Sequence, residues 1–338
     1  MDSLLSNDKR KALAFVATWL LLVAAAAASV LFGHRSFDFA TVMGAYTSFT
    51  GSDEQLIIRT SRVPRALTAA AIGASLAISG VLLQAMTRNP LASPSILGVN
   101  AGAALAIVAM LYGYGAKFSF SELMWFGFIG AGITACLIFI IAMIGKGGMT
   151  PLKLILTGSA LASFTASMNS LFMLISNETL EGALYWLAGS VSNSNMEYTL
   201  QMLPYFVLAW VIALFMSRSL NIVAMGDDVA TGLGQRMVWI RVATIVVVVV
   251  LAGGSVALAG PISFVGIMIP HISRWIIGND HRWVLPFSAV LGAAFLVLAD
   301  LLSRFLLPAK EVPVGVTTAI LGVFFVVALV RRKTIGQV

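Results

Sequence analysis

Residues 242–273 read VATIVVVVVLAGGSVALAGPISFVGIMIPHIS and carry no acidic or basic side chain apart from one histidine over 32 positions. A helix of that length would be about 48 Å long at 1.5 Å per residue, whereas the hydrocarbon core of a bilayer is about 30 Å thick. Ala259-Gly260-Pro261 divides the stretch, because proline lacks a backbone donor and glycine tolerates a turn. The stretch therefore predicts two membrane-spanning helices that meet near residue 260.

Similar uncharged stretches recur along the whole chain of 338 residues. Hydrophobic residues make up 59% of the chain and charged residues 10%, whereas soluble domains carry about 25% charged residues. A water-soluble globular protein is therefore excluded. With the longest run divided, the runs predict an all-α, polytopic membrane protein with about ten transmembrane helices. No loop is long enough for a soluble domain, so we expect residues 1–338 to form a single transmembrane domain. The runs lie at 12–34, 66–87, 89–116, 123–145, 154–177, 198–217, 242–273, 283–299 and 312–330.

Lysine and arginine are unevenly divided between the two predicted sides of the membrane. Both termini carry basic clusters, Lys9 to Lys11 and Arg331 to Lys333, which indicate a cytoplasmic position because basic residues beside short spans stay inside. With an even number of spans, inner segments hold 14 of the 21 Lys and Arg residues and outer segments hold 7. The first run, 12–34, has the length of a span and no clear processing site, so we expect no cleavable signal peptide.

Patterns typical of enzymes and metal sites are missing from the sequence. Gly145-Lys146-Gly147-Gly148 lacks the hydroxyl and the upstream glycine of a phosphate-binding loop, so the chain does not hydrolyse ATP. The single cysteine, Cys136, excludes a disulfide framework, and the three histidines, His34, His271 and His281, are far apart in sequence. We therefore expect no catalytic residue, no metal ligand and no cofactor.

Charged residues inside the predicted spans are scarce. Asp300 and Arg304 lie four residues apart near an outer end, where an ion pair on one helix face is possible. Ion-coupled transporters use buried acidic residues as relays. Without a chain of such acids, the sequence favours a passage whose energy comes from elsewhere.

Two polar segments are candidates for contact with partner proteins. In the inner segment Met225 to Gly234, the acids Asp227 and Asp228 favour a helix start and Gly232 favours its end. This segment is either a docking element or a plain connecting loop. At the outer entrance of the second span, Arg59, Arg62 and Arg65 run against the orientation bias. They are suited either to an acidic partner from outside or to lipid phosphates.

Several motifs together resemble the FecCD permease family, the membrane subunits of bacterial ABC importers for iron-siderophores, haem and vitamin B12. They follow the family order over nearly the whole chain. The matching stretches are 62–65, 73–80, Gln84, 88–94, 97–102, 185–190, 225–234, 259–266, 269–274, 280–282, 299–300 and 311–316.

The resemblance implies a type II ABC importer permease fold with ten helices in a bacterial inner (plasma) membrane. It implies a second permease subunit, identical or related, two cytosolic ATPase subunits and an external substrate-binding protein. It assigns a coupling segment at about 219–236 that sits in a groove of the ATPase. The residues that match this element are Met225, Gly226, Asp227, Asp228, Val229, Ala230, Gly232, Leu233 and Gly234.

The same resemblance assigns two further groups of residues. Arg62, Arg65 and Arg304 match positions that face acidic residues of the binding protein, and Arg59 lies just ahead of that motif. Thr150, Pro151 and Leu152, at the end of the inner turn from Lys146, match the cytoplasmic gate. Pro151 departs from the small hydroxyl residues of some members. His271 is interpreted as a structural histidine, because a Pro-His pair recurs at this place in the family whatever the cargo.

The sequence thus predicts the permease subunit of an ATP-driven importer for an iron(III)-siderophore, with ATP hydrolysis by a separate subunit. A haem or cobalamin importer is the alternative within the class. A proton- or sodium-coupled secondary transporter and a membrane scaffold that transports nothing are alternatives from other classes.

Overall fold

The computed structural model describes residues 4–5, 7–95, 98–114, 119–144, 150–307 and 311–335, and every regular element in these ranges is helical. Two π-helical turns, Ile58–Arg62 and Val249–Gly253, interrupt longer helices. The helices are α1 Asp8–Leu31, α2 Phe39–Thr47, α3 Asp53–Ile57, α4 Val63–Thr87, α5 Val99–Tyr114, α6 Phe120–Met143, α7 Pro151–Ile175, α8 Asn177–Leu187, α9 Met196–Phe215, α10 Ser217–Val223, α11 Asp227–Gly232, α12 Met237–Val248, α13 Gly254–Ala259, α14 Val265–Ile277, α15 His281–Ser303 and α16 Val314–Ile335.

Seven of the described helices are long and apolar enough to cross a membrane. Three shorter apolar helices, Val99–Tyr114, Val265–Ile277 and Val314–Leu329, accompany them. Taken together they follow the ten predicted runs in order, so the prediction of an all-α polytopic membrane protein is confirmed.

The long run at 242–273 is divided where the sequence predicts. α13 ends at Ala259, Gly260 has a φ of 71°, and α14 begins at Val265. A Cβ atom at Gly260 would lie 2.3 Å from the carbonyl oxygen of Trp186. Glycine is needed here both for the positive φ and for this close approach.

The second span begins earlier than the run at 66–87 predicts. α3, the π-helical turn and α4 form one continuous helix, Asp53–Thr87, so Arg59, Arg62 and Arg65 lie on a helix rather than in a loop. The first charged residue ends an uncharged run, but arginine is a good helix former, so it does not end the helix.

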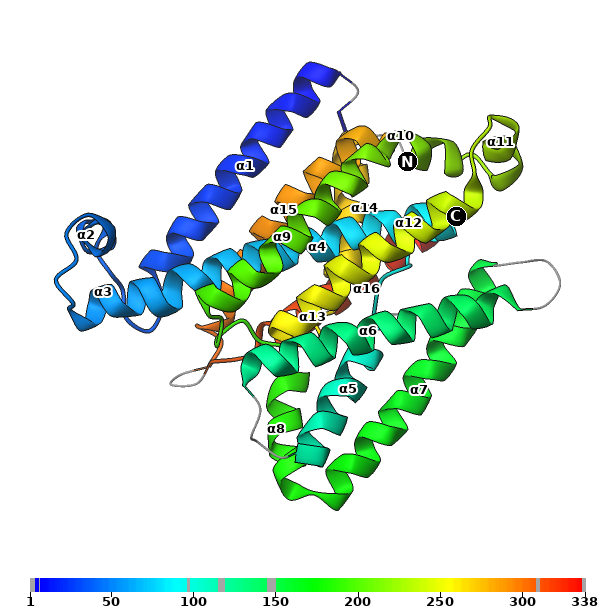
Figure 1. Ribbon diagram of the computed structural model, residues 1–338. Coiled ribbons are helices and arrows are strands. Elements are labelled where there is room, and N and C mark those ends of the chain that lie inside the picture. Colours follow the sequence, from blue (N-terminus) through cyan, green and yellow to red (C-terminus); the bar gives the residue numbers. More distant parts are fainter. Residues whose placement is uncertain are drawn as a thin grey trace.

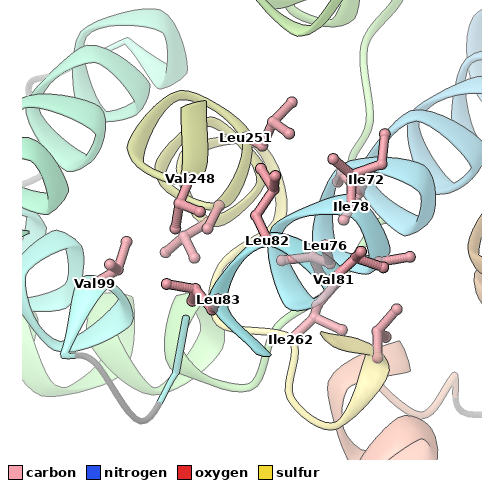
Figure 2. Packing of buried hydrophobic residues seen from close by; sticks show 14 of the residues in the cluster. Ile72, Leu76, Ile78, Val81, Leu82, Leu83, Val99, Val248, Leu251 and Ile262 are labelled. Carbon is pink, nitrogen blue, oxygen red and sulfur yellow. The ribbon is translucent and has the colours of Figure 1, made fainter. Parts of the chain in front are cut away.

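α4 lies at the centre of the bundle, packed against α15, α14, α9 and α12 (Figure 1). A Cβ at Gly73 would lie 2.2 Å from the carbonyl oxygen of Gly292, and one at Gly80 would lie 2.0 Å from that of Gly266. These glycines let α15 and α14 approach α4 at backbone distance, as is common in membrane helix packing. In Figure 2, Leu82 and Leu83 of α4 lie in a cluster with Val248 and Leu251.

The bundle has two chemically different ends. At one end, which we name the Asp300 end, Gly315 of α16 donates to the carbonyl oxygen of Gly189 and Ser190 to that of Ala259. At the other, the Asp227 end, Leu4 and Leu5 donate to the carbonyl oxygens of Trp275 and Ile276. α1 therefore begins at the Asp227 end, and α16 runs from the Asp300 end towards it.

Candidate functional site

Asp300 is the centre of a buried ion-pair network at the Asp300 end. Nε of Arg65 lies 3.0 and 2.9 Å from the two carboxylate oxygens of Asp300, and Nη2 of Arg65 lies 2.8 Å from Oδ1. Nη2 of Arg304 donates to Oδ2 of Asp300 at 2.6 Å. The ion pair expected from the spacing of Asp300 and Arg304 is therefore confirmed.

The network joins four segments that are far apart in sequence. Nη1 of Arg65 lies 2.6 Å from Oε2 of Glu311, just ahead of α16. The guanidinium of Arg304 donates to the carbonyl oxygen of Ser29 at 2.7 Å and to its hydroxyl at 2.8 Å. Buried cations are tolerated only when hydrogen-bonded partners offset the loss of hydration. The network thus fixes α1, α4, α15 and the approach to α16 against one another.

The burial of Arg65 and Arg304 differs from the expectation that these arginines face a partner protein. Arg65 is 5% exposed and Arg304 1% exposed, so neither guanidinium is presented at the surface. The contact between Arg65 and Asp300 joins residues 235 positions apart, which no sequence spacing reveals. Direct contact of Arg65 or Arg304 with a binding protein stays a prediction.

Arg59 and Arg62 occupy a different environment at the same end. Arg62 donates to the carbonyl oxygens of Phe32 at 2.6 Å and Arg35 at 3.0 Å. Arg59 donates to the carbonyl oxygen of Ala45 at 2.6 Å, and its guanidinium lies 4.1 Å from the ring centroid of Phe49. Within the described ranges neither side chain forms an ion pair, so their positive charge is not neutralised.

Two short helices at this end, α2 and α3, extend beyond the bundle. α2 and α3 project past the end of α1 (Figure 1). Phe39, Met43, Tyr46 and Phe49 on or beside α2 are exposed. An apolar surface next to unneutralised arginines has the composition of a protein or membrane contact surface.

At the Asp227 end, the short helix predicted in the inner segment is confirmed. α11 spans Asp227–Gly232, and it is flanked by Gly226 with a φ of 127° and Gly234 with a φ of 80°. Asp227 accepts from Arg88, which caps α4, and from Arg241 of α12. Asp228 is exposed and forms no ion pair with the residues that the structure describes. The two acids therefore differ: Asp227 holds the segment in place and Asp228 faces solvent.

α11 and its flanks present an apolar surface. Met225 just before α11, Val229 within it and Leu233 at its C-cap are all exposed. Ala230, next to Val229, is completely buried against the bundle. Three exposed apolar side chains on and beside a short helix are suited to a groove of another protein.

The predicted gate lies partly outside the described residues. Thr150 caps α7, its hydroxyl accepting from the backbone N–H of Lys153 at 3.3 Å, and Leu152 is exposed. Pro151 is the first residue of α7. Lys146 and Met149 lie outside the described residues, so the gate stays a prediction.

The middle of α7 carries a polar face that the sequence analysis missed. Ser159, Ser163, Ser167 and Ser170 are exposed and lie on one side of the helix, with exposed Leu156 and Leu174 beyond each end of the stripe. Ser167 and Ser170 donate to the carbonyl oxygens of Ser163 and Ala166. The helical spacing of these serines could have revealed the stripe.

α6 provides a contrast within the same structure. Its exposed face carries Ile129, Ile133, Leu137 and Ile140, the composition that lipid requires. The serine face of α7 is therefore better suited to water or to another protein than to hydrocarbon.

A large cavity between α1, α4, α9 and α15 has a volume of about 440 Å³. Its walls include Trp19, Leu67, Trp210 and Pro286, and none of its lining residues is charged. A cavity with this lining is suited to an acyl chain and offers no charged group to recognise a polar cargo.

Comparisons with known proteins agree with this arrangement. Residues 21–332 match the FecCD transport family. The chain is 45% identical to the probable siderophore transport system permease protein YfiZ of Bacillus subtilis strain 168, over 92% of this chain and 93% of that protein. It is 46% identical to the Fe(3+)-citrate import system permease protein YfmD of the same organism, over 83% of each chain.

A solved structure supports the fold. The inward-facing structure of a metal-chelate type ABC transporter matches with a TM-score of 0.83 and 32% identity, covering 94% of this chain and 98% of that one. The family match covers far more than half of the chain, and the ten apolar helices of the described residues follow the order of the runs in the sequence. The chain therefore belongs to the FecCD transport family.

Proposed function

We propose that this chain is the membrane-spanning permease subunit of an ATP-driven importer that carries an iron(III)-siderophore into the cytoplasm. The names of its relatives, a siderophore and an iron-citrate permease, support this class of cargo. The sequence has no phosphate-binding loop of its own, so ATP is hydrolysed by two separate cytosolic subunits.

The observation that carries the proposal is the serine face of α7. A polar cargo needs hydroxyl and water contacts at the depth of the hydrocarbon core, and lipid supplies neither. Ser159, Ser163 and Ser167 supply hydroxyls in the middle of a membrane-length helix. In the proposed complex this face lines the pathway opposite a second permease subunit. Leu156 and Leu174 narrow the pathway at its two ends.

α11 is the proposed coupling element. Its exposed Met225, Val229 and Leu233 enter a groove of the ATPase, and the ion pairs of Asp227 transmit the movement to α4 and α12. This assignment places both termini and the Asp227 end in the cytoplasm of a bacterial cell with the chain in its inner membrane.

The Asp300 end is the proposed docking surface for the external binding protein. Arg59 and Arg62 attract its acidic residues because no carboxylate of the described residues neutralises them. Arg65 and Arg304 support the surface through the Asp300 network. A direct role for Arg65 requires Glu311 to leave its guanidinium.

Uptake by the complete transporter tests the proposed cargo and energy source. Permease, ATPase and binding protein are reconstituted in liposomes, and accumulation is measured with single ⁵⁵Fe-labelled siderophores, ⁵⁵Fe-labelled haem and cobalt-labelled cobalamin. We expect uptake of a ferric siderophore that requires ATP inside and persists when ionophores collapse the ion gradients. Uptake that follows a proton or sodium gradient without the ATPase would identify a secondary transporter. Uptake of haem or cobalamin alone would reassign the cargo.

Cysteine labelling tests the pathway face. In a Cys136→Ser background, Ser163→Cys on α7 is compared with Ile133→Cys on α6, both exposed side chains of membrane-length helices. We expect a water-soluble maleimide to modify the α7 cysteine at least ten times faster, since thiolate forms in water and not in lipid. Equal rates would contradict the assignment of α7 to the pathway.

A further inference from the structure

A polar pocket of about 240 Å³ opens at the Asp227 end, beside α11 and away from the Asp300 network. It lies where the C-terminal end of α4, the end of α14 and the start of α15 meet the residue that follows α10. The polar and charged lining residues are Gln84, Arg88, Arg274, Asn279 and His281, and Ala224 stands in the wall.

Arg274 is held in this pocket without a counter-ion. Gln84 is buried, and its Nε2 donates to the carbonyl oxygen of Gly266 at 3.0 Å, so its Oε1 is left to accept from Nη2 of Arg274. No carboxylate in the described ranges forms an ion pair with Arg274. A guanidinium has five N–H donors, and this contact uses one of them.

Two acids at this end, Asp227 and Asp280, are already engaged with other partners. Asp227 accepts from Arg88 and Arg241. Asp280 accepts from Nδ2 of Asn221 at 2.7 Å and from the backbone N–H of Arg282 at 3.0 Å. Burial alone would raise the pKa of Asp280, but these hydrogen bonds and the charges of Arg282 and Lys11 lower it below its ordinary value. Asp280 is thus a stable anion engaged with its own partners.

His281 is engaged with Asn221 and does not serve as a counter-ion for Arg274. Its Nδ1 lies 2.7 Å from Oδ1 of Asn221, and its backbone N–H donates to the same oxygen at 2.9 Å. Arg88 adds a second guanidinium to the wall and Asn279 an amide. The pocket therefore combines the Arg274 guanidinium, which forms no ion pair, the Arg88 guanidinium, which is paired with Asp227, and further donors around a space large enough for a small anion.

The position of the pocket at the ends of the helices indicates which anion it binds. Its walls include the ends of α4 and α15, two helices long and apolar enough to cross a membrane, and Trp275, next to Arg274 on α14, is exposed. Tryptophan is enriched where the bilayer meets water, and basic pockets between helix ends at this level bind the phosphate of lipid headgroups. We propose that this pocket binds a phosphate group at the membrane surface, with Arg274 as the principal cation and Gln84 as the residue that positions it.

Two sources can deliver this chemistry, an anionic lipid and free phosphate, and one experiment separates them. The full chain is placed in nanodiscs of phosphatidylcholine alone or with phosphatidylglycerol. Thermal unfolding is followed during a titration with inorganic phosphate at constant ionic strength, and retained lipid is identified by native mass spectrometry. We expect phosphate to raise Tm in phosphatidylcholine. If the lipid is the natural source, phosphatidylglycerol is retained and removes the phosphate response.

Two matched pairs of variants test the residues. Arg274→Gln removes the principal cation, and Arg282→Gln removes an exposed arginine of the same end. Ala224→Glu places a competing carboxylate in the wall, and Ala224→Gln has the same shape without the charge. We expect Arg274→Gln and Ala224→Glu to weaken phosphate or lipid binding roughly ten-fold or more, the effect of losing one charged hydrogen bond. The two control variants, Arg282→Gln and Ala224→Gln, should retain phosphate or lipid binding. The Ala224 pair decides the matter if Arg274→Gln does not fold.

Other outcomes would overturn the proposal. If phosphate and phosphatidylglycerol both leave Tm unchanged and neither remains bound, a phosphate site is excluded. If instead Arg274→Gln and Ala224→Glu change only the association with the ATPase, the natural ligand is a carboxylate of that partner. Either result leaves the proposed transport function untouched, because that function is measured by iron uptake.

Discussion

Asp300 shows how one carboxylate can determine the geometry of a whole membrane surface. It accepts from Arg65 and Arg304, and all three side chains are buried. Within a bilayer protein, a cation without its partner cannot be hydrated by bulk water. The carboxylate is therefore required for the two arginines to be buried at all.

Replacing Asp300 should destabilise the permease strongly. Asp300→Asn leaves two buried cations without their shared anion, and breaking a buried ion pair costs about 3–5 kcal/mol. Thermal unfolding of the purified permease in detergent measures the loss. Glu311→Gln is the control, because its side chain is 36% exposed and water can replace it. Equal losses from the two variants would contradict a buried anion at Asp300 as the centre of the network.

Arg59 and Arg62 should affect docking of the binding protein. Arg59→Gln and Arg62→Gln each remove a charge that no carboxylate of the described residues neutralises, so association with the binding protein weakens several-fold and more so in combination. Binding to permease in nanodiscs measures this at two salt concentrations, and high salt should weaken the wild type in the same direction. Arg35→Gln is the control, an exposed arginine at the same end. Affinities that match this control would mark Arg59 and Arg62 as lipid contacts.

At the scale of elements, both ion pairs between α11 and the bundle are formed by the side chain of a single acid. Asp227 contacts Arg88 at the end of α4 and Arg241 on α12, whereas Asp228 points to solvent. Arg88 has a φ of 49°, which ends α4 and turns the chain. The central helix and the short helix therefore meet at one ion-pair cluster.

This connection predicts different effects for two adjacent acids. Asp227→Asn should lower the ATP hydrolysis that the binding protein stimulates several-fold, because α11 loses its link to α4, while Asp228→Asn has little effect. Stability should fall by only about 1 kcal/mol, since these ion pairs are partly exposed. Stimulated ATPase activity in nanodiscs is the measurement.

A charge reversal sharpens this test. Arg88→Asp with Asp227→Arg restores the pair, and aspartate tolerates the positive φ at residue 88 better than most residues. The double variant should recover part of the activity that Asp227→Arg loses. If Asp227→Asn and Asp228→Asn behave alike, the ion pairs have no part in coupling.

At the scale of the whole molecule, the chain separates two charged surfaces by an apolar bundle. The Asp300 end carries the arginine network with α2 and α3, and the Asp227 end carries α11 and the Arg274 pocket. Fourteen of the 21 basic residues lie in segments predicted to be inside. We therefore expect the two ends to face opposite sides of the membrane.

Single cysteines at exposed positions test this sidedness. In a Cys136→Ser background, Glu54→Cys on α3 should react with an impermeant maleimide added outside intact cells, or spheroplasts if an outer membrane is present. Asp228→Cys on α11 should react only after the membrane is opened. Reaction of the α11 cysteine from outside would invert the proposed orientation.

The sequence by itself determined the class of fold, the order of the spans and the short helix at α11. These depend on local chemistry: hydrocarbon demands uncharged helical runs of a certain length, and the Gly-Pro pair at 260–261 favours the end of a helix. The ion pair of Asp300 and Arg304 could also be predicted from local chemistry, because residues four apart lie about one helical turn apart.

Only the tertiary structure decided where the arginines lie and what they contact. Arg65 meets Asp300 across 235 residues, and Arg274 meets Gln84 across 190. Gly73 and Gly292 bring α4 and α15 together at backbone distance, and this packing sets which side chains are buried. Burial and long-range pairing depend on how helices pack, and packing depends on the shapes of many side chains at once. A local pattern in the sequence therefore predicts each helix and leaves its partners undecided.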